Sequence, residues 1–86
     1  MADSEWVTMT EGVKRRIKVD GEKMMLVEVR FEAGAAVPQH SHPHEQISYV
    51  ASGRMLFTVN GEAVEVAAGE SLHLPSNVQH AARALE

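Results

Sequence analysis

Short stretches of alternating apolar and polar residues run along this chain, separated by turn signals. The first alternates apolar and basic side chains and ends at Asp20-Gly21, a strong two-residue hairpin signal. The returning stretch places Met25, Val27, Val29 and Phe31 on one face, because side chains two apart share a face of a strand. Ser52-Gly53 and Asn60-Gly61 mark two further turns. The expected strands are residues 13–19, 23–32, 46–51, 54–59, 62–66, 71–75 and 78–84.

This pattern predicts an all-β fold. Seven or eight short strands, each followed by a turn at intervals of about 8–12 residues, are typical of a sandwich or barrel. No segment has an apolar stripe at helical period. At 86 residues the chain is long enough for one domain with a small core, so residues 1–86 are expected to form a single domain.

Composition limits the classes of partner. The apolar fraction of 44% is ordinary for a folded protein, and a net charge of -4 argues against nucleic acid as a partner. The basic run Lys14, Arg15, Arg16 and Lys18 is interpreted as a solvated edge strand. There is no apolar run of the roughly 20 residues that span a bilayer, and the polar, acidic N-terminus is unlike a signal peptide. We therefore expect a cytoplasmic protein with no membrane partner.

The residues that suggest chemistry lie between Gly34 and Gly53. His40, His42, His44 and Gln46 fall within seven residues, and His80 follows far downstream. On a strand, His40 and His42 share a face. Gln46 joins them if the chain turns at Pro43-His44, and His80 must come from a non-adjacent strand. Because the chain has no cysteine, any metal would be held by nitrogen and oxygen, and we predict a four-ligand metal site.

Other polar and large residues receive simpler interpretations. His44 is expected at the rim of the site, and His73, between two leucines, is interpreted as a partly buried histidine with a local hydrogen bond. Glu45 should point outward, whereas Ser48 is in phase with Gln46. The Met24-Met25 pair is interpreted as core filling. Gln39 and Arg54 are expected near the rim, and Trp6 and Tyr49 are as consistent with core or interface as with substrate contact.

Both histidine segments resemble the two motifs of the cupin family. In the first, Gly34 is followed at the family's spacing by His40, His42, Gln46 at the usual acidic position, and Gly53. The second has Gly69, Pro75, Asn77 where glycine is usual, and His80. The resemblance implies a cupin-type antiparallel β-barrel, also described as a double-stranded β-helix or jelly roll. It also implies that His40, His42, Gln46 and His80 bind a divalent transition metal: nickel, zinc, iron, manganese or copper.

Within that family, HSHPHEQISYVASG and LPSNVQHA resemble the KdgF-like pectin-degradation cupins. This resemblance implies ring opening and ketonisation of unsaturated uronates, with a small sugar acid as ligand and a homodimer as the usual assembly. No acid/base residue can be identified, and the chain resembles a cupin shortened at its C-terminus. A non-catalytic scaffold that binds metal or a sugar acid therefore remains an alternative, and Gln46 disfavours a cupin dioxygenase. We expect an edge left open by a missing strand to be covered by dimerisation or strand exchange.

Overall fold

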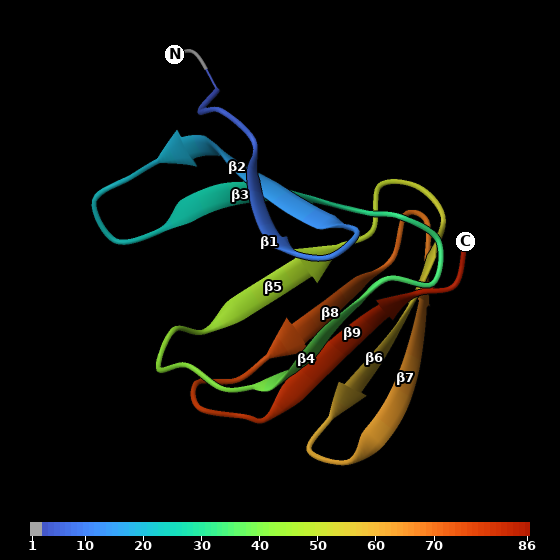
Figure 1. The fold of residues 1–86 in the computed structure, drawn as a ribbon. Helices are drawn as coiled ribbons and strands as arrows, with labels where there is room; N and C mark the ends of the chain where they lie inside the picture. The colour runs from blue at the N-terminus through green and yellow to red at the C-terminus, as the bar shows by residue number, and fades with distance from the viewer. Residues whose placement is uncertain (1–2) are drawn as a thin grey trace.

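The computed structural model describes residues 3–86, which form nine β-strands and no helix (Figure 1). A strand before residue 13 was not predicted, and the expectation that His40 and His42 share a strand is wrong, because the strand ends at His40. In chain order the strands are β1 (Val7–Thr10), β2 (Val13–Asp20), β3 (Met25–Phe31), β4 (Ala36–His40), β5 (Gln46–Tyr49), β6 (Arg54–Val59), β7 (Glu62–Ala67), β8 (Ser71–Leu74) and β9 (His80–Ala84). In the described part of the chain, no helix is long and apolar enough to cross a membrane.

The strands form three antiparallel sheets, ordered β1-β2-β3, β4-β9-β6-β7 and β5-β8. Figure 1 shows the first at one end of the molecule and the second at the other, with β5 and β8 between them in this view. The all-β, antiparallel jelly-roll prediction is confirmed. The barrel itself is not closed, since among the described residues β3 and β5 each have a strand partner on one edge only.

Backbone conformation at the turns explains which hairpin predictions succeed. Asn60 and Gly61 both have positive φ, 50° and 84°, as a tight two-residue turn between β6 and β7 requires. The two-residue turn predicted at Asp20-Gly21 is wrong. Asp20 instead pairs with Met25, and the Gly21 N–H donates to the Met24 carbonyl to close a four-residue connection. The register of this hairpin also shifts by one residue between Ile17 and Val19.

A compact core lies against the four-stranded sheet. Its buried centre is Val50, Phe57 and Val66. Partly buried apolar side chains from β6, β7, β8 and β9 pack around it, namely Met55, Val59, Val64, Leu72 and Ala82. Leu74, on β8, is completely buried. This core holds β6 and β9 together, and β9 carries His80.

The β1-β2-β3 sheet is far less buried than its sequence suggested. Met24 and Met25 are 81% and 53% exposed, so the prediction that they fill the core is wrong. Met24 lies in the four-residue turn and Met25 at the start of β3, where no second layer covers them. The expectation that residues 13–19 form an edge strand is also wrong, because β2 is the central strand of this sheet.

We predict that substitutions at the buried Leu74 and at the exposed Met24 differ in their effect on stability. Leu74→Ala should lower the free energy of unfolding by roughly 2–5 kcal/mol, because it removes a fully buried side chain and leaves a cavity. Met24→Ala should change it by no more than about 0.5 kcal/mol. Urea denaturation followed by circular dichroism measures both. Equal destabilisation by the two substitutions would contradict the assignment of the core.

Candidate metal centre

Two strands distant in sequence bring the first pair of histidines together. His40 is the last residue of β4, His80 is the first residue of β9, and the two are directly opposite each other in the strand register. His80 was predicted to lie on a strand that is not adjacent to the strand of His40, but β9 pairs directly with β4. Pro38 lies where the register shifts between Val37 and His40, on an edge strand that tolerates its missing N–H. The shift sets the position of His40 at the end of the strand.

His42 lies in the connection between β4 and β5, and the loop before β9 holds it in place. The Asn77 N–H donates to the His42 carbonyl at 2.8 Å, and the Ser76 hydroxyl donates to the Pro43 carbonyl. Asn77 adopts a φ of 65°, a left-handed conformation that favours glycine or asparagine. This conformation accounts for asparagine at a position where the motif usually has glycine. The turn before β9 thus fixes both His80 and the loop that carries His42.

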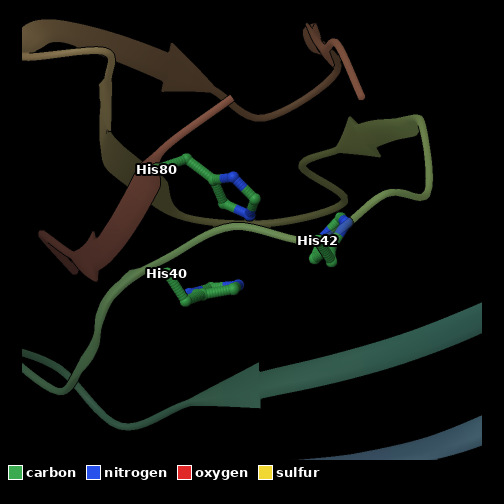
Figure 2. A group of neighbouring side chains, drawn as sticks. All are labelled: His40, His42 and His80. Atoms are coloured by element: carbon green, nitrogen blue, oxygen red, sulfur yellow. The ribbon is translucent and has the colours of Figure 1, made fainter. Parts of the chain in front are cut away.

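The three imidazole rings face a shared space (Figure 2). One ligand atom from each of His40, His42 and His80 lies within 4.8 Å of the others, close enough for all three to hold a single ion. Ring centroids are 4.3 Å apart for His40 and His80 and 5.0 Å apart for His42 and His80. His80 is only 4% exposed, His42 is half-buried and His40 is exposed. The group is therefore closed on the β9 side and open on the β4 side.

Hydrogen bonds to the backbone determine which ring nitrogen is available. His40 Nδ1 lies 2.9 Å from the Pro38 carbonyl, His42 Nδ1 2.9 Å from the His44 carbonyl, and His80 Nδ1 3.0 Å from the Val78 carbonyl. A carbonyl oxygen can only accept, so each Nδ1 must donate. In a neutral imidazole the other nitrogen, Nε2, then carries a lone pair. All three rings thus present a metal-binding nitrogen, and the backbone fixes their orientation as metal-bound histidines require.

Gln46, the first residue of β5, adds an oxygen to this set. Its Nε2 donates to the Ser48 hydroxyl at 2.9 Å, which turns its Oε1 toward His42 Nε2 at 3.1 Å. With Nδ1 of His42 donating elsewhere, both facing atoms are acceptors. Two lone pairs that face each other repel, and a cation coordinated by both atoms would relieve that repulsion. The donor set therefore fits a divalent metal with three nitrogens and one oxygen.

Burial also keeps the deepest imidazole in its neutral form. Desolvation lowers the pKa of His80 below its ordinary value of 6.5, the Val78 carbonyl partly opposes this shift, and His40 and His42 add to it. A lowered pKa means that the unfolded chain binds the proton more readily than the folded one. The stability that His80 contributes is therefore present above about pH 6.5 and is lost as the pH falls below it. At neutral pH His80 is neutral, the form that binds metal.

The remaining polar residues lie at the rim or outside the site. His44 is exposed, with its ring 5.9 Å from that of His42, and its carbonyl rather than its ring orients His42. His73 is exposed and bonds the outward-pointing Glu45, 28 residues away in sequence, so the expected partial burial and the expected local hydrogen bond are both wrong. Gln39 and Arg54 are both exposed, and their side chains have partners outside the cluster. Gln39 forms a hydrogen bond with Gln79, and Arg54 forms an ion pair with Glu65.

A hollow of about 380 Å³ opens beside His40 on the exposed side of the cluster. Met9 and Thr10 of β1 form one part of its wall, and Val37 and Pro38 of β4 form another. Sequence reasoning missed the contribution of β1, because a four-residue strand with no chemistry-bearing motif gives no signal. Among residues 3–86, the group of close potential ligand atoms contains no carboxylate.

Comparison with known proteins agrees with this architecture. Residues 27–86 match the model of the cupin domain family. The chain is 32% identical to the pectin degradation protein KdgF of Dickeya dadantii (strain 3937), over 98% of this chain and 77% of that protein. The structure of KdgF from Halomonas sp. superposes with a TM-score of 0.88 at 31% identity, covering 95% of this chain and 76% of that one. An RmlC-like cupin from Shewanella frigidimarina NCIMB 400 gives a TM-score of 0.88 at 32% identity, covering 95% and 74%.

The histidines of the sequence motif, which lie together in the structure, also lie within the segment that matches the cupin family. The cupin match begins within β3 and includes every residue of the histidine cluster. Together with a relative that is 32% identical over nearly the whole chain, it shows that this protein belongs to the cupin family.

Proposed function

We propose that this cupin binds one divalent transition metal through His40, His42 and His80, with Gln46 as the fourth ligand. One observation supports the proposal: ring nitrogens of the three histidines lie close together, each Nδ1 donates to a backbone carbonyl, and the Gln46 amide oxygen lies 3.1 Å from His42 Nε2. Nickel, zinc, iron, manganese and copper all suit three nitrogens and an oxygen. A neutral donor set leaves the charge of the ion uncompensated, so the ion would polarise a bound oxygen strongly.

The activity that we propose is ring opening and ketonisation of unsaturated uronates released from pectin or alginate. The similarity to pectin degradation proteins named KdgF supports this substrate class. The exposed His40 and the adjoining hollow leave a side through which a sugar acid can approach. A bound metal would act as a Lewis acid and stabilise the negative charge that develops as the hemiacetal opens. The Nδ1-to-carbonyl bonds keep the three rings oriented throughout.

A second candidate is a scaffold that binds metal or a sugar acid without turnover. The observation in its favour is that the described histidine cluster contains no carboxylate to transfer the proton that ketonisation requires. Glu45 pairs with His73 on the outer side of β5 and β8. A dioxygenase is the weakest candidate, because Gln46 stands at the position of the usual acidic ligand.

We expect His80→Ala to weaken metal binding by more than about 100-fold, a larger loss than removal of an outer hydrogen-bond partner causes. His44→Ala is the matched control, because the His44 backbone carbonyl, which the substitution keeps, orients His42. Calorimetric titration of chelator-treated protein with Zn²⁺ or Ni²⁺ measures both affinities. His40→Ala, at an exposed position, tests the same ligand set if the His80 variant folds poorly. Unchanged affinity in the folded ligand variants would contradict the metal site.

We expect the metal-loaded protein to convert a 4,5-unsaturated galacturonate from its cyclic to its linear ketonised form. The reaction can be followed by loss of the cyclic signals in NMR spectra. The chelator-treated protein and the His40→Ala variant serve as controls. If the loaded protein binds metal tightly but gives no rate above these controls, the scaffold function replaces the catalytic one.

The protein is also proposed to form a homodimer that covers its open sheet edge. The β1-β2-β3 sheet exposes Val7, Val19, Leu26 and Val29 by 40–60% of their surface. Antiparallel pairing of β3 with its copy, centred on Val29, would place Glu28 of one chain opposite Arg30 of the other. Opposite charges on facing strands stabilise such pairing.

Light scattering at several concentrations should therefore give the mass of two chains. Val29→Glu should shift the mass toward that of one chain, because two carboxylates would meet at the centre of the paired strands. Ala63→Glu, on β7 and also exposed, is a control with the same charge change. A monomer mass independent of concentration in the unsubstituted protein would disprove the dimer.

A further inference from the structure

A concentration of positive charge lies on one face of the β1-β2-β3 sheet, away from the histidine cluster. Because β2 is a strand, Lys14, Arg16 and Lys18 share a face. Arg30 joins them from β3, directly opposite Lys14 in the register. These are four of the eight lysine and arginine residues of a chain whose net charge is -4. The face is therefore much more basic than the protein as a whole.

Ion pairs account for only part of this charge. Lys18 donates to Asp3 at 2.8 Å, and Arg16 donates to Glu28 at 3.0 Å. These hydrogen bonds lower the pKa of each carboxyl group, so both carboxylates are ionised at neutral pH and held by their partners. Arg30 shares Glu28 at 3.3 Å, and its side chain is 60% exposed. Lys14 forms no ion pair within residues 3–86.

Thr8, Lys14 and Arg30 form a row across the three strands, since Thr8 pairs with Lys14 and Lys14 with Arg30. We call these three residues the cationic row. Two positive charges directly opposite each other on neighbouring strands repel and destabilise the pair. An anion held between them removes that repulsion and accepts hydrogen bonds from an ammonium, a guanidinium and a hydroxyl group. Within residues 3–86 Glu28 accepts a hydrogen bond from Arg30, whereas the Lys14 ammonium has no acidic partner, so an anion beside Lys14 would supply the missing acceptor.

The cationic row lines a hollow of about 400 Å³. The remaining wall comes from the start of β2 and the turn before it, with Gly12 and Val13, and from the end of β3, with Phe31 and Glu32. Thr8 lines this hollow, whereas its neighbour Met9 lines the hollow beside His40. The two hollows share no lining residue, and none of His40, His42 and His80 lines the hollow of the cationic row. A ligand on the cationic row is therefore separate from the metal centre.

We propose that this hollow binds a small hydroxy acid. Its carboxylate lies between Lys14 and Arg30, where Thr8 supplies a further donor. Glu32, also in the wall of the hollow, repels a second negative charge but can accept a hydrogen bond from a hydroxyl group. This arrangement selects a carboxylate and a hydroxyl on one molecule rather than a simple anion or a neutral sugar. The volume suits a monosaccharide-sized ligand and is too small for a polymer chain.

Trp6, the single tryptophan, reports on this site directly. Its ring centroid lies 5.5 Å from the Lys14 ammonium and 4.9 Å from the Arg30 guanidinium. An anion that draws either cation away from the ring changes the environment of the indole. Titration of chelator-treated protein with galacturonate should therefore produce a saturable change in tryptophan fluorescence. Galactose, acetate and inorganic phosphate are the comparison ligands, and galacturonate is expected to bind more tightly than each of them.

Lys14→Gln and Arg30→Gln should each weaken galacturonate binding about tenfold, the loss expected for one charge-assisted hydrogen bond. Lys23→Gln is the matched control, since it removes the same charge from the exposed turn before β3 and should leave binding unchanged. His80→Ala should also leave it unchanged, which separates this site from the metal centre. The proposal is overturned by a non-saturable response, by an equal loss in Lys23→Gln, or by acetate or phosphate binding as tightly as galacturonate.

Discussion

The pairing of β4 with β9 is the constraint on which the rest of the site depends. At one end it places His40 opposite His80, and at the other the Gly34 N–H donates to the Ala84 carbonyl and the Ala84 N–H donates to the Ala35 carbonyl. Because β9 also pairs with β6, the same strand connects the histidines to the buried core around Phe57. A displacement of β9 would therefore separate His80 from His40 and disturb the core at the same time.

The chemistry of the centre follows from how its polar atoms are occupied. Backbone carbonyls accept a hydrogen bond from Nδ1 of each histidine, and the Ser48 hydroxyl accepts one from the Gln46 amide nitrogen. The atoms that remain, the ring Nε2 atoms and the Gln46 oxygen, are all electron-pair donors. These atoms differ in their exposure to solvent, because His80 is deeply buried and His40 is exposed. A neutral set of this kind, buried at His80 and exposed at His40, would bind a cation and leave the exposed side to a ligand.

The fold class and the positions of the histidines could be predicted because turn residues and motif spacing are local signals. Asn60-Gly61 fixes a hairpin through its own backbone preferences, and the His40–His42 spacing is visible in the chain itself. Which strands pair, and which faces remain open, depends on long-range contacts. The burial of Met24 and Met25 was predicted wrongly for that reason: alternation indicates a strand but cannot say whether another layer covers it. The neutral tautomers likewise depend on carbonyl positions that no sequence pattern encodes.

The register between His40 and His80 also bears on how the chain folds. These residues are neighbours in space but forty positions apart in sequence, whereas β6 and β7 are joined by a two-residue turn. Contacts between distant residues form slowly because the loop between them must close first. The β6–β7 hairpin can therefore form early, while the ligand set is complete only after β9 has joined β4. An ion held by both strands would close that forty-residue loop, so its release should be coupled to separation of the strands.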